Sequence, residues 1–133
     1  MSGFLDTSMV VRYLTRDVPE MAEQAAAIID GGDNLWITGV TLAEVDHVLR
    51  SVYLMSREIV IDHLTTFVGK QNIVCHELDK GTAMRALLMC LPSGRISVAD
   101  AMIWASTRTS GQNVVYSFDQ RFPSEGIEVR TQP

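Results

Sequence analysis

The chain has 133 residues, which fits a single compact domain spanning residues 1–133. Hydrophobic residues make up 47% of it and charged residues 20%, so it has enough apolar material for a core without disulfides or a structural metal. The net charge of -5 argues against a protein that coats nucleic acid. It does not exclude a nuclease, because carboxylates that collect metal ions make a small protein acidic.

The two cysteines and the apolar segments indicate a compartment. Cys75 and Cys90 lie in apolar stretches, where a free thiol behaves as a small hydrophobic group, and this suits a reducing environment. No charged segment followed by a long apolar segment opens the chain, and no apolar run approaches the roughly 18 residues of a membrane span. We therefore expect a cytoplasmic protein with no signal peptide and no contact with membrane.

Strand and helix signals alternate along the chain. The first half predicts, in order, a strand at Gly3–Leu5, a helix at Met9–Thr15, a helix from Val18-Pro19-Glu20 to Gly31-Gly32, a strand at Leu35–Thr38, a helix capped by Thr41 that runs past Val52, and a helix from Ser56 to Gly69. The second half predicts a strand at Ile73–Cys75, a helix capped by Asp79 that ends near Leu91, a helix from Ser97 to near Gly111, a strand at Asn113–Tyr116 and a short edge strand at Ile127–Arg130.

This alternation predicts the fold class. The turns are too short for strands to pair antiparallel across the helices, so we expect an α/β protein with a mostly parallel sheet covered on both faces. The expected architecture is a single-domain, three-layer α/β/α sandwich. Functional groups in such sheets gather outside the carboxyl ends of the strands.

Four carboxylates follow that rule. Asp6 follows the first strand, Glu44 lies in the first turn of the helix after the second strand, and Asp119 follows the fourth strand. Asp100 lies in the first turn of the helix after the Pro92-Ser93-Gly94 loop. We expect all four to converge at one end of the domain.

Each acid also has a purely structural interpretation. Asp6 is placed to cap a helix, Thr41-x-x-Glu44 and Ser97-x-x-Asp100 have capping-box spacing, and Asp119 is placed to cap a turn. Asp6 and Asp119 nevertheless follow apolar strands, where a carboxylate is costly unless it is paired or bound to a metal. That cost favours a metal site.

Other chemistries fit the sequence less well. His47 has no second histidine at a zinc spacing, and no glycine-rich phosphate loop is present. A phosphoacceptor receiver domain or a haloacid-dehalogenase-type phosphatase would also place an aspartate after the first strand. Both use a late lysine, whereas the last lysine here is Lys80, and the phosphatase wants a second acid where this chain has Ser8.

Four segments together resemble one family. They are Phe4-Leu5-Asp6-Thr7-Ser8, Thr41-Leu42-Ala43-Glu44-Val45, Ser97-Val98-Ala99-Asp100-Ala101 and Tyr116-Ser117-Phe118-Asp119-Gln120-Arg121-Phe122. In order, spacing and total length, the chain resembles the PIN-domain ribonucleases, and within them the VapC-type toxins of bacterial toxin–antitoxin pairs. The resemblance covers essentially the whole chain.

The resemblance implies a site and its chemistry. Asp6, Glu44, Asp100 and Asp119 would be the catalytic residues and the metal ligands, supported by Thr7 and Ser117. The metal would be Mg²⁺, with Mn²⁺ as a possible substitute, since both prefer hard oxygen ligands and activate a bound water. Many relatives carry a further acid where this chain has Ser97, so the number of bound ions stays open.

The resemblance also implies substrate and partners. The substrate would be structured RNA of the tRNA or rRNA class. Separately from the resemblance, the candidates to contact RNA phosphates are Arg12, Arg16, Arg95 and Arg121, and surface solvation is the alternative role for each. The expected protein partners are a cognate antitoxin and a second copy in a homodimer, with residues 41–67 as one surface for them or as ordinary helix–helix core. The alternative function is a non-catalytic PIN-like module that acts by binding a partner protein.

Overall fold

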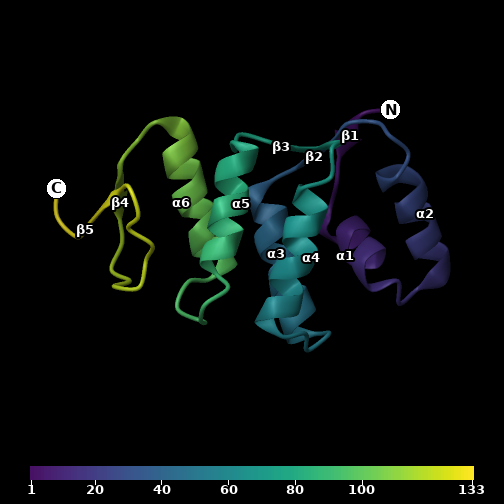
Figure 1. Cartoon of the computed structure of the whole chain (residues 1–133), viewed down its shortest axis with the longest axis horizontal. Coiled ribbons are helices and arrows are strands. Elements are labelled where there is room, and N and C mark those ends of the chain that lie inside the picture. The colour runs from purple at the N-terminus through teal and green to yellow at the C-terminus, as the bar shows by residue number, and fades with distance from the viewer.

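The computed structural model describes residues 1–133 and contains six helices and five strands (Figure 1). All strand pairs are parallel, which confirms the predicted α/β class. The elements in chain order are β1 (Gly3–Phe4), α1 (Thr7–Thr15), α2 (Pro19–Ile29), β2 (Leu35–Ile37), α3 (Gly39–Ser51), α4 (Arg57–Val68), β3 (Ile73–Cys75), α5 (Lys80–Met89), α6 (Val98–Ser110), β4 (Val114–Tyr116) and β5 (Glu128–Arg130).

Short-range capping signals set most helix boundaries. The side chains of Ser56, Asp79 and Ser97 cap α4, α5 and α6, and each accepts a hydrogen bond from the backbone N–H three residues later. Gly111 ends α6 at a φ of 84°, in the left-handed region that favours glycine. These boundaries confirm the predicted ones.

The start of α3 differs from its prediction. The helix begins at Gly39, and the cap is Thr38, whose hydroxyl accepts a hydrogen bond from the backbone N–H of Thr41 at 3.1 Å. Thr38 keeps an extended backbone, which directs its hydroxyl toward the free N–H groups of the first turn. The expected capping role of Thr41 is therefore wrong, and Glu44 lies in the second turn of the helix instead of the first.

The first three strands form one sheet in the order β1-β2-β3. In Figure 1 this sheet lies along the top of the molecule, and helices α3 to α6 extend below it. Leu35, Ile37 and Ile73 are buried in the core, whereas Trp36 alternates with them and stacks on the exposed Phe4 with ring centroids 6.0 Å apart. The side chains of Phe4 and Trp36 therefore line an aromatic face that is partly open to solvent.

The last two strands form a second, two-stranded sheet at the far end of the molecule (Figure 1). The sequence predicted one sheet, whereas the structure has two, and α6 packs against α3 between them. Gly39 at the start of α3 lies next to Met102 of α6, where a Cβ would make ordinary van der Waals contact. Three residues, Gly111, Gln112 and Asn113, separate α6 from β4.

One continuous core joins the helices to the first sheet and to the C-terminal segment. Trp104 of α6 is fully buried, and its indole N–H donates to the backbone carbonyl of Glu125 at 2.8 Å. Phe122 is buried in the same core, and Arg108 donates to the carbonyl of Gly126 at 3.0 Å. These contacts fix the segment between β4 and β5 to α6. None of the helices is long and apolar enough to span a membrane.

We predict that Trp104→Ala lowers the free energy of unfolding by about 3–5 kcal/mol, because it empties a large buried site. Trp104→Phe should cost less, since it keeps most of the ring and loses one hydrogen bond worth about 1 kcal/mol. Urea unfolding followed by circular dichroism measures both. Limited proteolysis should cut Trp104→Ala after residue 111 faster than wild type, and equal cutting would contradict the anchoring of the C-terminal segment.

Candidate active site

Asp6 stands between β1 and α1, in the position expected of a site residue. It occupies the N-cap position of α1, yet its side chain makes no capping hydrogen bond to the helix. Its carboxylate is exposed and accepts a hydrogen bond from the Ser8 hydroxyl at 3.0 Å. The capping interpretation of Asp6 is therefore excluded, and the carboxylate remains available to a ligand. Thr7 follows as the first residue of α1 and is half-buried.

Glu44 projects from α3 into a cavity of about 1160 Å³ between α3 and α6. The side chain is exposed, and the second turn of a helix has no free backbone N–H for it to cap. His47 and Ile103 line the same cavity, so its wall combines polar and apolar groups. The structure gives Glu44 no local bonding role, which leaves it free for a ligand.

Asp100 lies in the first turn of α6, as the sequence predicts. Its backbone N–H donates to the hydroxyl of Ser97 at 3.1 Å, and its side chain is half-buried.

Asp119 is held in a turn after β4. Its carboxylate accepts a hydrogen bond from the backbone N–H of Arg121 at 2.8 Å, which is the turn-capping role considered for it. Its own backbone N–H donates to the hydroxyl of Ser117 at 3.0 Å. Ser117 thus orients the backbone of Asp119, and one carboxylate oxygen stays without a backbone partner.

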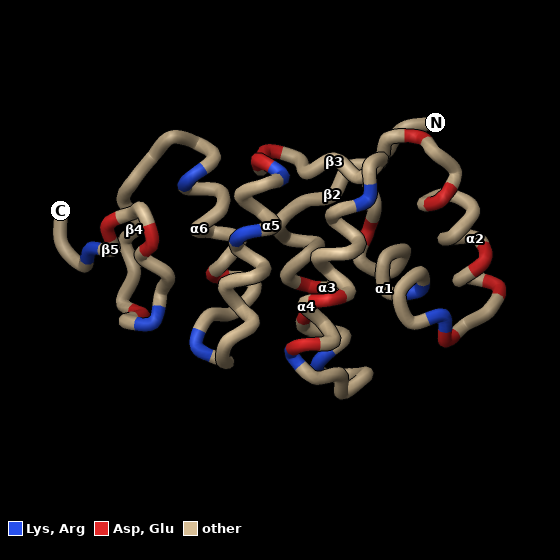
Figure 2. Tube along the Cα trace, in the orientation of Figure 1, with Lys and Arg blue, Asp and Glu red and all other residues tan.

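One chain does not bring these four acids together. No group of three or more His, Cys, Asp or Glu side chains lies close enough to hold a metal ion. Figure 2 shows acidic residues spread along the whole length of the trace, not gathered in one patch. As arranged within one chain, the acids do not fit a Mg²⁺ ion. The division of the strands into two sheets separates β4, which precedes Asp119, from β1, which precedes Asp6.

The four arginines considered for RNA binding differ in their surroundings. Arg12 is bound to both carboxylate oxygens of Asp17, at 2.9 and 2.8 Å. Arg16 lies over the ring of Tyr13 at 5.6 Å, and Arg121 lies 3.7 Å from a carboxylate oxygen of Asp119. Arg95 is exposed in the loop before α6 and makes no ion pair. Arg95 is thus the least engaged of the four.

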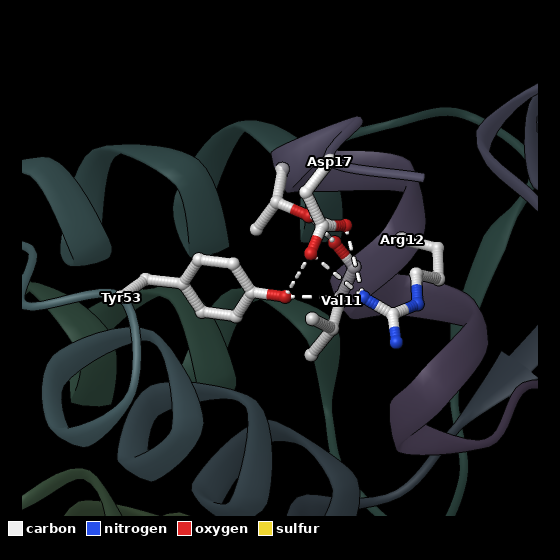
Figure 3. A network of polar contacts seen from close by, with 5 residues as sticks. Val11, Arg12, Asp17 and Tyr53 are labelled. Atoms are coloured by element: carbon white, nitrogen blue, oxygen red, sulfur yellow. Dashed lines mark hydrogen bonds and ion pairs between the residues drawn. The ribbon is translucent and has the colours of Figure 1, made fainter. Parts of the chain in front are cut away.

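Two acids that the sequence analysis did not single out have fixed partners. Asp46 is 5% exposed and accepts two hydrogen bonds from the guanidinium of Arg50, at 2.9 and 2.7 Å. Their i, i+4 spacing on a helix was the available signal. Asp17 joins the end of α1 to the turn after α3, because it accepts hydrogen bonds from Tyr53, Thr15 and Arg12 (Figure 3).

The model of the PIN domain family matches residues 3–125. The chain belongs to the PIN domain family. PIN domains are typically nucleases that bind RNA and use divalent metals, and this membership supports a hydrolase-type enzyme. The search of curated proteins returned no match.

The Asp17 network predicts an acid dependence of stability in this PIN domain. The hydroxyl of Tyr53, then that of Thr15 and the guanidinium of Arg12, hold the pKa of Asp17 well below its usual range. A lowered carboxyl pKa stabilises the fold above the unfolded-state value, and that contribution is lost as the pH falls toward the folded-state value. Asp17→Asn should therefore destabilise the protein more at pH 7 than at pH 2.5, as measured by urea unfolding. An equal loss at both pH values would contradict the network.

The burial of the two cysteines predicts how slowly their thiols react. Burial, and after it the charge of Asp46, raises the pKa of Cys90 to about 12, and burial also raises the pKa of Cys75. Because the thiolate is the reactive form, neither thiol should react with a disulfide reagent at pH 8 in the native state, and both should react in guanidinium. The raised pKa values also predict stability that falls as the pH rises above the ordinary thiol range. Fast reaction of a native thiol would contradict this burial.

Proposed function

We propose that this PIN domain is a divalent-metal-dependent endoribonuclease, with Mg²⁺ as the ion and Mn²⁺ as a substitute. The single observation that carries the proposal is the match to the PIN domain family over residues 3–125. The four acids support it chemically, because carboxylate oxygens are the ligands that these hard cations prefer. Asp6 and Glu44 support it structurally, because both carboxylates are exposed and neither caps a helix.

We further propose structured RNA of the tRNA or rRNA class as the substrate and a toxin role in a type II toxin–antitoxin pair. The resemblance of the four sequence segments to VapC-type toxins supports this assignment. A cognate antitoxin in the cytoplasm would then be the protein partner. Arg95 is the best-placed candidate for an RNA phosphate, since it is exposed and makes no ion pair.

A cleavage assay tests the nuclease directly. A pool of small RNAs, incubated with the protein and Mg²⁺, should give discrete fragments that disappear when EDTA is added. Asp6→Asn should lower the cleavage rate at least about a hundred-fold, because loss of a metal ligand removes several kcal/mol of charge stabilisation. Asp62→Asn is the matched control, since Asp62 is an exposed acid on α4 that should not affect cleavage. Equal cleavage by wild type and Asp6→Asn would refute the acidic site.

A metal-binding measurement separates the enzyme from a non-catalytic binding module. Ligands that bind only the native state raise the melting temperature. Mg²⁺ or Mn²⁺ should therefore raise the melting temperature of wild type and of Asp62→Asn, and should raise that of Asp6→Asn less. If no divalent ion shifts the wild-type value and no RNA is cut, the PIN-like binding module becomes the better account of the chain.

A further inference from the structure

The open face of the first sheet carries a cluster of three rings. Phe4 of β1 and Trp36 of β2 are paired across the sheet, and their rings are stacked with centroids 6.0 Å apart. The imidazole of His76, just after β3, lies edge-on to both, at 5.1 Å from the Phe4 ring and 6.2 Å from the Trp36 ring. These three residues form an aromatic platform, in which two neighbours hold the Phe4 ring while 60% of Phe4 stays exposed.

The fold does not use the aromatic platform as core. Helices α3 to α6 extend below the first sheet in Figure 1. Trp36 is neither part of the hydrophobic core nor packed against it, although it is one of only two tryptophans in the chain. An exposed cluster of large apolar side chains typically marks a binding surface.

The polar surroundings of the platform indicate what it binds. Side chains two residues apart on a strand lie on the same face of a sheet. The residues two positions before and after Phe4 and Trp36 are all polar: Ser2, Asp6, Asn34 and Thr38. The apolar strip is therefore a single row of rings with hydrogen-bonding groups on both sides. It is too narrow for the apolar face of a helix or for a second sheet, whereas a nucleobase combines a flat apolar face with a polar edge.

The aromatic platform lies beside the candidate active site. The backbone of Asp6 is extended, with a φ of -88° and a ψ of 160°, so it continues the direction of β1. Phe4 and Asp6 are therefore about 6–7 Å apart along the same face, at about 3.3 Å per residue. A similar distance separates the base of a nucleotide from its own phosphate. A base stacked on Phe4 thus brings its phosphodiester to the Asp6 carboxylate.

We propose that the aromatic platform binds an unpaired base of the RNA substrate, stacked on Phe4 beside Trp36 and with His76 at its edge. Membership of a family of RNA-binding nucleases supports RNA as the occupant. A base within a duplex has its faces covered by its neighbours, so only an unpaired base can stack in this way. Base binding itself does not depend on catalysis. The consequence that the cut lies beside the stacked base rests on the proposed nuclease function.

Tryptophan fluorescence tests base binding without any enzyme activity. Trp104 is fully buried, so Trp36 is the tryptophan that RNA can reach. In EDTA, a short oligoadenylate should quench the wild-type emission saturably, because a base stacks beside Trp36. Inorganic polyphosphate, which carries the charge without bases, should not quench it, and Trp36→Phe should abolish the quenching by oligoadenylate.

Substitutions of Phe4 test the stacking itself. Phe4→Leu should raise the Kd for oligoadenylate about ten-fold, because it removes a base–aromatic stack, and Phe4→Tyr should keep the wild-type Kd. Leu88→Ala is the matched control, since Leu88 is an exposed apolar residue on α5, outside the platform. No quenching of wild type, or an unchanged Kd for Phe4→Leu, would overturn the proposal. A change in the mass of Phe4→Leu by light scattering, with no change in Kd, would assign this face to a second copy and would also overturn it.

A hairpin RNA with one unpaired loop tests the link to the acidic site. In Mg²⁺, wild type should cut beside a loop base, and Phe4→Leu should lower kcat/KM about ten-fold. The rise in melting temperature that Mg²⁺ causes should be the same in both proteins, because Phe4 binds no metal. Cutting within the stem, or an unchanged kcat/KM, would overturn this link. If no preparation cuts RNA but Phe4→Leu still weakens oligoadenylate binding, the nuclease function fails and the aromatic platform stands.

Discussion

The anchoring of the C-terminal segment to Trp104 is the constraint on which the rest of this structure depends. A fully buried indole that donates to the carbonyl of Glu125 holds the chain after β4 against α6. α6 in turn packs against α3, with Met102 next to Gly39. Together these contacts decide where β4 and β5 lie, and hence that the sheet is divided in two.

The position of each acid is set by its own segment of the chain, and bringing the acids together is a separate requirement. Each carboxylate is positioned by its own segment: Asp6 by the end of β1, Glu44 by α3 and Asp119 by a turn that Ser117 orients. None of these local arrangements requires the others. A metal site needs several oxygens around one point, and no group of three or more His, Cys, Asp or Glu side chains meets that condition within one chain.

Two acids with clear structural roles show why long-range contacts escape a sequence analysis. The pair of Asp46 and Arg50 is visible in the sequence as an i, i+4 spacing, but the burial of Asp46 is not. The bond between Asp17 and Tyr53 joins residues 36 positions apart, and no pattern in the sequence indicates it. The same holds for Lys80, whose ammonium donates to the carbonyls of Lys70 and Ile73.

The sequence by itself determined the α/β class, the strands, most helix boundaries and the PIN family, because caps, periodicity and motifs act over a few residues. It misplaced the cap of α3, since Thr38 and Thr41 are both good capping residues and only the backbone conformation distinguishes them. Only the tertiary structure decided the division of the sheet, the placement of Asp119 away from Asp6 and the exposure of Phe4 beside Trp36. Those features depend on which helix faces pack together, and that packing depends on contacts between residues that are far apart in the sequence.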